Sequence, residues 1–147
     1  MLHGTRNETG STPATPAANI GGWPLVLCGY LAVWQPLSFA AVAAGAIPAL
    51  AIRGWLLGLL LGVKLGVTAT GLAAVLALFH RRPGAIALLA VALTLAAAMD
   101  LLVYTTSIFP NNRLPGTTPF YMAWSLVFHG GWLLYLWRSR RIRRIVA

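Results

Sequence analysis

The chain has 147 residues, of which 59% are hydrophobic and only 9% are charged. Its mean hydropathy of +0.76 and its long apolar segments exclude an ordinary soluble domain, because a soluble chain of this length carries fewer and shorter apolar runs. The net charge of +9 comes mainly from arginines that flank the apolar segments, where they act as topology signals, so nucleic acid is not expected as a partner. The composition predicts an integral membrane protein.

The N-terminal residues 1–19 are polar and rich in Ser, Thr, Pro and Gly. They lack the apolar region of a cleavable signal peptide and predict a disordered tail. Residues 20–147 then form the transmembrane domain. The one cysteine, Cys28, lies in an apolar run, so we expect a core residue that takes no part in a disulfide or a metal site.

Four apolar segments follow, at about 23–52, 54–79, 85–109 and 120–137. Each is long enough to cross about 30 Å of hydrocarbon as a helix, the last one only just. The apolar runs are continuous and lack the alternation of a membrane β-barrel. The predicted fold is all-α, a transmembrane four-helix bundle, and Pro36 and Pro48 are expected to bend its first span.

The arginines predict the orientation of this bundle. Four spans place both termini on one side of the membrane together with eight arginines, and leave only Arg53 and Arg113 on the other side. The positive-inside rule then predicts that both termini are cytoplasmic. The tail at 138–147 is expected to lie on the membrane surface as an interfacial segment. Its arginines would contact anionic phospholipid, with docking of an acidic partner as the alternative: Arg138, Arg140, Arg141, Arg143 and Arg144.

A single lysine, Lys64, lies in the middle of the second apolar segment. A lysine at this depth costs roughly 2.5 to 3.5 kcal/mol on insertion scales, so it requires a partner or a wet cavity. Lys64 precedes Arg82 by 18 residues, and Asp100 follows Arg82 by 18 residues, so in an antiparallel hairpin both lie at the same depth. We predict an ion pair between Lys64 and Asp100. The pair either fixes helix register alone or titrates and binds a ligand during a functional cycle.

Further polar residues are expected near the same depth. Asp100, Tyr104 and Ser107 form one stripe on the third span, and Gln35 stands beside Pro36 on the first. On the fourth span, Tyr121, Ser125 and His129 recur every four residues, with Tyr121 and Ser125 closest in depth to Asp100. These side chains predict either a polar cavity or interhelical hydrogen bonds that only hold the bundle together. For His129 the alternatives are a packing residue or a proton relay, and no metal site is predicted.

Gly58, Gly62 and Gly66 recur every four residues on the second span. Small residues at this spacing let a neighbouring helix approach closely. At 100° per residue Lys64 points nearly opposite to this ridge. The glycine face packs either against the first or fourth span or against a partner, which includes a second copy of the chain.

Several of these phrases together resemble a known family. "IGGWPLVLCGYLAVWQPL" opens the first span, "FHRRPGAIALL" forms the hairpin, Asp100 lies in the third span, and "WLLYLWRSRRIRRIV" closes the chain. They resemble the bacterial small membrane proteins catalogued as domain of unknown function 2569. The residues that match the family pattern are Gly21, Gly22, Trp23, Pro36, Tyr135, Ser139, Arg141 and Ile142, whereas Gln35, Ile145 and Val146 depart from it. The resemblance implies a four-span protein of the bacterial cytoplasmic (inner) membrane and implies no activity.

The sequence favours a function without catalysis. The chain has no nucleophile and base in a recognisable motif, and no cofactor is predicted. The first hypothesis is an accessory, scaffold or assembly component of a larger membrane complex. The alternative is a small transporter or lipid-handling protein, in which the Lys64 and Asp100 pair helps to form a polar intramembrane cavity.

Overall fold

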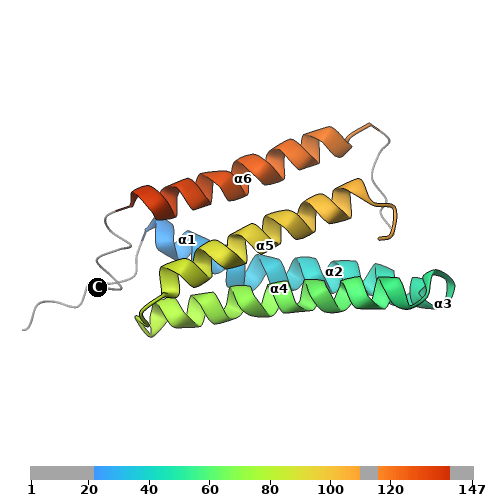
Figure 1. Cartoon of the computed structure of the whole chain (residues 1–147), viewed down its shortest axis with the longest axis horizontal. Helices are drawn as coiled ribbons and strands as arrows, with labels where there is room; N and C mark the ends of the chain where they lie inside the picture. The colour runs from blue at the N-terminus through green and yellow to red at the C-terminus, as the bar shows by residue number, and fades with distance from the viewer. Residues whose placement is uncertain (1–21, 110–115, 140–147) are drawn as a thin grey trace, which may run out of the picture.

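The computed structural model describes residues 22–109 and 116–139, and every regular element within these ranges is helical. Figure 1 shows that the helices form elongated rods aligned along the long axis of the molecule. The first rod, Trp23–Arg53, is made of five short elements: α1 (Trp23–Gly29), η1 (Tyr30–Trp34), α2 (Gln35–Ala46), η2 (Ile47–Ala49) and α3 (Leu50–Arg53). The other rods are α4 (Trp55–Phe79), α5 (Ala85–Thr105) and α6 (Thr118–Arg138). The predicted all-helical class is confirmed for this part of the chain.

Three of the rods are long and apolar enough to cross a membrane: Trp23–Arg53, Trp55–Phe79 and Ala85–Thr105. The fourth rod, α6, has 21 residues, but its serine, histidine, glycine, tryptophan and tyrosine residues lower its hydropathy. Large apolar side chains stand exposed on the outside of all four rods, among them Val33, Leu65, Val91 and Val127. Such a surface suits lipid and does not suit water, so these features are those of a membrane protein.

The first rod changes its helix type at both prolines. η1 is a π-helical turn that ends at Trp34, two residues before Pro36. η2 is a 3₁₀ turn that contains Pro48. Proline lacks a backbone N–H, and its ring crowds the preceding turn, so the hydrogen-bond register shifts there. The rod continues beyond both prolines, and the bend expected at Pro36 and Pro48 stays a prediction. The π-helical turn is the segment that carries Tyr30 and Trp34.

The hairpin between α4 and α5 is tight. Arg81 has a φ of 50° and Gly84 has a φ of 87°, so two residues in the left-handed region reverse the chain within a few positions. At the far end of the molecule, Gly54 with a φ of 72° separates the first rod from α4. Both turns lie where the sequence changes from an apolar segment to arginine or glycine.

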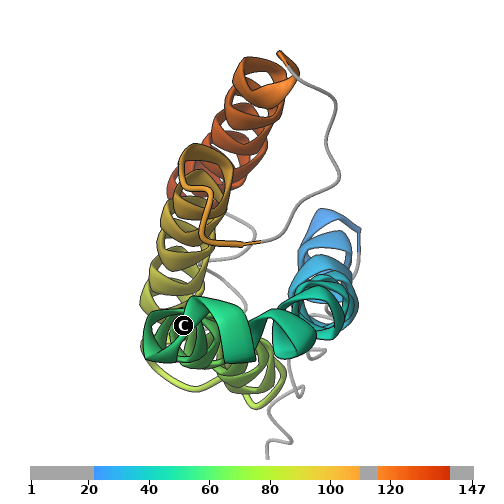
Figure 2. The same cartoon turned by 90° about the vertical axis from the view of Figure 1, so that its right-hand side faces the viewer.

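The packing order places α5 in the middle. It packs against α4 along one side and against α6 along the other, and the first rod packs against α4 through η1 and α2. Figure 2, viewed along the rods, shows α5 between α4 and α6 and the first rod beside α4. A second connection joins the first rod to α6 through aromatic rings, since Tyr30 packs on Phe128 and Trp23 packs on Trp132.

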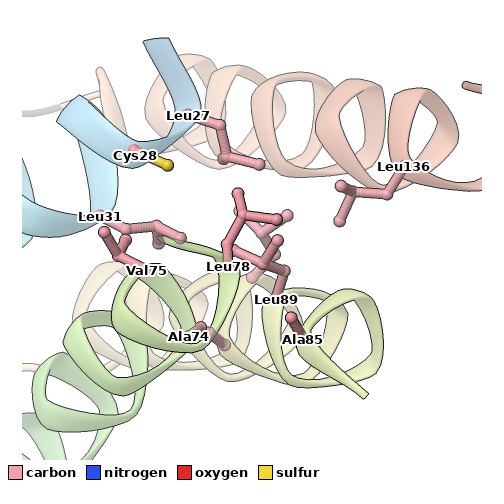
Figure 3. Close-up of a cluster of buried hydrophobic side chains, with 11 residues drawn as sticks. Leu27, Cys28, Leu31, Ala74, Val75, Leu78, Ala85, Leu89 and Leu136 are labelled. Atoms are coloured by element: carbon pink, nitrogen blue, oxygen red, sulfur yellow. The ribbon is translucent and has the colours of Figure 1, made fainter. Parts of the chain in front are cut away.

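Two apolar clusters fill the interior. The first apolar cluster lies near the α4–α5 turn and is drawn in Figure 3; it includes Leu31, Leu78, Leu89 and Leu136. Cys28 belongs to this cluster and is buried, which agrees with its predicted place in the core. The second apolar cluster lies toward the opposite end and includes five buried residues: Ala46, Leu57, Met99, Val103 and Phe109. The buried polar side chains lie between these two clusters along the rods.

Candidate functional site

Asp100 lies in a wall between two neighbouring cavities. The smaller one, about 150 Å³, is enclosed by the first rod, α4 and α5, and Lys64 lines it; we call it the lysine cavity. The larger one, about 450 Å³, lies between η1, α5 and α6, and we call it the aromatic cavity. Four residues line both cavities: Tyr30, Trp34, Asp100 and Tyr104. The single acidic side chain of the described helices is therefore accessible from two sides.

A chain of hydrogen bonds connects Asp100 to the first rod through α6. Ser125 donates from Oγ to Asp100 Oδ2 at 3.1 Å. His129 Nδ1 lies 2.9 Å from the backbone oxygen of Ser125 and 3.2 Å from its Oγ. The other ring nitrogen of His129, Nε2, lies 2.9 Å from the hydroxyl of Tyr30. These four residues, Tyr30, His129, Ser125 and Asp100, are the hydrogen-bond chain of the site.

The partners fix the direction of each bond in this chain. The backbone oxygen of Ser125 can only accept, so the proton of a neutral imidazole is assigned to His129 Nδ1. Nε2 then accepts from the hydroxyl of Tyr30, and the hydroxyl of Ser125 donates to the carboxylate. All donors therefore point along the chain from Tyr30 toward Asp100, which is the arrangement that stabilises a carboxylate in a buried environment.

Burial is unequal along the hydrogen-bond chain. His129 and Ser125 are 2% and 4% exposed, whereas Tyr30 and Asp100 are half-buried and reach the cavities. Both nitrogens of His129 have partners, as expected of the packing histidine that the sequence allows. Its position between Tyr30 and Ser125 also leaves the proton-relay alternative open.

Lys64 faces Asp100 across the lysine cavity. Its side chain is 8% exposed, and the carboxylate of Asp100 is the charged group that acts on it. In the described structure the ammonium and the carboxylate make no direct ion pair. The hydrogen bond that Asp100 makes instead is with Ser125 on α6, through Oδ2. Lys64 and Asp100 line the same small cavity, in agreement with the equal depth predicted for them. They face each other as opposite charges and do not form the predicted ion pair.

Gln35 closes the lysine cavity on the side of the first rod. Its Oε1 is buried and has no hydrogen-bond partner. A Cβ at Gly71 on α4 would lie 2.7 Å from this oxygen and 3.6 Å from Leu31. The absence of a side chain at Gly71 therefore leaves room for the side chain of Gln35 between the first rod and α4, and the unsatisfied oxygen is a position where a ligand or water can donate a hydrogen bond.

The other predicted polar residues divide into two groups. Tyr104 lines both cavities, Tyr121 lines the aromatic cavity, and their rings lie 6.0 Å apart between centroids. Ser107 was predicted to extend the stripe of Asp100, and this is wrong: α5 ends at Thr105, and Ser107 is exposed beyond it. Only the backbone oxygen of Ser107 has a role in the fold, because it accepts a hydrogen bond from Arg53.

The glycine ridge contacts the rest of the chain only at one end. A Cβ at Gly58 would lie 3.6 Å from Leu50, in ordinary contact, whereas a Cβ at Gly62 or Gly66 would meet nothing within 4 Å. The hypothesis that this face packs against the first or fourth span is therefore wrong at Gly62 and Gly66. The close helix approach occurs instead at Gly71, on the face that also carries Lys64.

Sequence reasoning missed several lining residues. Tyr30 and Trp34 line both cavities, Thr68 lines the lysine cavity and Phe128 lines the aromatic cavity, and none of them was predicted from the sequence. For Thr68 a signal existed, because Lys64, Thr68 and Gly71 follow each other at spacings of four and three on one face of α4. Tyr30 gave no such signal, since its approach to His129 depends on how the first rod lies against α6.

The basic tail lies mostly outside the described residues. Arg138 ends α6 and is exposed, whereas Arg140, Arg141, Arg143 and Arg144 are not described, nor are the tail at 1–19 and the loop at 110–115. Within the described ranges, no three His, Cys, Asp or Glu side chains come together as a metal site would require. Comparisons with protein-family models, with curated proteins and with solved structures found no match, so the resemblance to the domain of unknown function 2569 family stays a prediction.

Proposed function

We propose that this chain is a small membrane protein that binds, and thereby handles or transports, a polar or amphiphilic molecule in the two cavities around Asp100. The observation that carries the proposal is the placement of Asp100: it lines both cavities, accepts from Ser125, and faces Lys64. Charges inside a membrane protein are costly and commonly mark a ligand or ion pathway. The proposal selects the transporter or lipid-handling alternative of the sequence analysis.

The proposed setting is a bacterial inner membrane crossed four times, with α6 as the fourth span and both termini in the cytoplasm. Support for the fourth span comes from its 21 residues and its packing against α5. Support for the orientation comes from the arginines. The hydroxyl of Ser125 is almost completely buried and donates a hydrogen bond to Asp100, so we assign it to positioning the carboxylate, and the proposed role of the site is binding without catalysis.

The experiment is extraction of the tagged protein from its native membrane in mild detergent, followed by mass spectrometry of bound lipids, small molecules and proteins. We expect one lipid or small molecule to be enriched with the wild type and to be lost from Asp100→Asn. The variant Thr94→Ala is the matched control, because Thr94 is exposed on the same helix and its hydroxyl donates to the backbone oxygen of Ala90 within that helix. A protein bound in stoichiometric amount, with no enriched small molecule, would contradict the proposal.

A second experiment distinguishes a role of the two charges in helix register from a role in ligand binding. In the charge-exchanged double variant, Lys64→Asp with Asp100→Lys, opposite charges still share the lysine cavity. If the charges serve only helix register, the exchanged protein folds and keeps its ligand. For a binding site we expect it to fold and to lose the ligand, since the acidic group no longer faces the aromatic cavity.

A second candidate function is supported by the open glycine face of α4. Gly62 and Gly66 have free space around them and lie away from Lys64. Small residues on an open helix face allow another transmembrane helix to approach closely. An accessory component of a larger complex, or a homodimer, would use this face. Gly62→Leu should then release the partner while ligand retention by Asp100 is unchanged.

A further inference from the structure

The aromatic cavity has an unusual lining for a protein interior. Six of the nine residues that line it are aromatic: Tyr30, Trp34, Tyr104, Tyr121, Trp124 and Phe128. Among the described residues, Asp100 is the one acidic residue in this lining, and neither lysine nor arginine contributes to it. An aromatic wall with one carboxylate and no fixed cation is electrostatically negative, because the faces of aromatic rings carry partial negative charge.

The cavity also has a polar floor and an apolar rim. On the floor, Ser125 and His129 are almost completely buried. At the rim, Trp34 and Trp124 are 62% and 63% exposed, although both line the cavity. A ligand with a charged end and an apolar end would therefore place its charge beside Asp100 and its apolar part between the two tryptophans.

The chemistry of the lining selects the ligand's charge. An anion would meet Asp100, and no arginine or lysine of residues 22–109 and 116–139 lines the cavity to offset the repulsion. A divalent metal ion would need several oxygen ligands, and the lining offers one carboxylate. An organic ammonium group is stabilised by aromatic faces and by a carboxylate at once, and a quaternary ammonium needs no hydrogen-bond acceptor at all.

We infer that the aromatic cavity is a binding site for an organic ammonium group, with Asp100 as its counter-ion and the aromatic side chains as its cage. The inference rests on the proposed function and names its ligand class. The ammonium belongs either to a free amine such as choline or to a lipid headgroup, and the experiment below separates these two sources.

Lys64 has a defined part in this site. It lies across the lysine cavity from Asp100, on the other side of the wall that the two cavities share. Without a ligand its ammonium is the counter-ion available to the carboxylate, and a bound organic ammonium takes over that role. The ammonium of Lys64 thus competes with the ligand for the carboxylate of Asp100. Removal of the Lys64 charge should therefore strengthen ligand binding.

The test uses the full chain in bilayer nanodiscs of phosphatidylglycerol, a lipid without an ammonium group. The probe is choline, and its uncharged isostere 3,3-dimethylbutan-1-ol is the control, with empty nanodiscs as the blank. Binding is followed by tryptophan fluorescence, since Trp34 and Trp124 line the cavity. We expect choline to bind at least about tenfold more tightly than its isostere.

Four variants assign this binding to the site. Asp100→Asn and Trp124→Leu should each weaken choline binding by about tenfold or more, whereas Lys64→Met should strengthen it by a similar factor. Trp55→Leu is the matched control for Trp124→Leu, because Trp55 is 80% exposed and lines neither cavity. Circular dichroism and a single elution peak identify the variants that fold, and the gain of affinity in Lys64→Met cannot come from misfolding.

The source of the ammonium follows from adding phosphatidylcholine to the nanodiscs. A lower apparent affinity for choline means that a lipid headgroup reaches the site, and an unchanged affinity means that the site takes the free amine. Equal binding of choline and its isostere, or choline binding that Asp100→Asn leaves unchanged, overturns the inference. Retention of a different ligand that depends on Asp100 would then leave the proposed function standing, whereas the absence of any such ligand would remove both.

Discussion

Ser125 on α6 donates a hydrogen bond to Asp100 on α5 at 3.1 Å, and this contact connects the hydrogen-bond chain to the wall between the two cavities. The same serine offers its backbone oxygen to His129. Side chain and backbone of one residue thus hold two different partners. A substitution that removes only the hydroxyl can separate these two roles.

Ser125→Ala should destabilise the protein by about 0.6 kcal/mol, because interhelical side-chain hydrogen bonds in membrane proteins average about 0.6 kcal/mol and reach about 1.7 kcal/mol at most. His129 should keep its place, since alanine retains the backbone oxygen that holds Nδ1. The measurement is the free energy of unfolding in mixed micelles of increasing sodium dodecyl sulfate. Thr94→Ala serves as the control, because its hydroxyl bonds only within α5; an equal loss in both variants would contradict the assigned role of Ser125.

Gly71 and Gly66 should respond oppositely to a larger side chain. Gly71→Leu places a Cβ 2.7 Å from Gln35 Oε1 and 3.6 Å from Leu31, so the leucine must displace the side chain of Gln35 and crowd Leu31, at a cost of about 1 to 3 kcal/mol. Gly66→Leu meets open space within the chain and gains helix propensity, so it should be neutral or stabilising. The same unfolding titration compares the two.

The reason for the difference can be checked with Gln35→Ala. Combined with Gly71→Leu, it removes the atom that the new side chain meets, so the double variant should recover part of the loss. Additive effects of the two changes would show that Gln35 is not the group that limits the approach of the helices.

Arg53 connects the end of the first rod to the segment that follows α5. Its guanidinium donates to the backbone oxygens of Ser107 and Ile108, just after the end of α5, where helix termini leave carbonyls without partners. Arg53→Lys keeps the positive charge but removes the guanidinium nitrogen Nη1, which donates to both oxygens. We expect faster amide hydrogen exchange at residues 106–109 and unchanged exchange near the α4–α5 turn. Arg82→Lys, an exposed arginine at that turn, is the control; an equal change in both variants would refute the role of Arg53.

Much of the fold is readable in the sequence because membrane helices end where charges and turn-forming residues begin. The predicted segment 54–79 differs from α4 by one residue, and 85–109 differs from α5 only where the chain continues past Thr105. The equal depth of Lys64 and Asp100 follows from helix rise alone. Ser125 was likewise expected near Asp100, because depth along an antiparallel neighbour is fixed by the same geometry.

The remaining part of the site depends on rotation and packing, which depth does not determine. The ridge of Gly58, Gly62 and Gly66 has the spacing of a packing surface, yet only Gly58 meets another rod. Ser107 has the spacing of a stripe, but the helix ends before it. Tyr30 and Trp34 reach the cavities because a π-helical turn precedes Pro36, and the sequence shows the proline without showing how the turns before it rearrange.

The orientation of the chain can be measured with single cysteines in a Cys28→Ser background. Pro83→Cys lies in the α4–α5 turn beside Arg81 and Arg82, and Asn111→Cys lies in the segment that carries Arg113. Because the arginine excess predicts a cytoplasmic α4–α5 turn, a membrane-impermeant maleimide applied to intact cells should label Asn111→Cys and leave Pro83→Cys unlabelled. Cell lysis should then expose Pro83→Cys to the reagent. Labelling of both sites in intact cells would mean that α5 does not cross the membrane, and the reversed pattern would mean that the arginines do not set the topology.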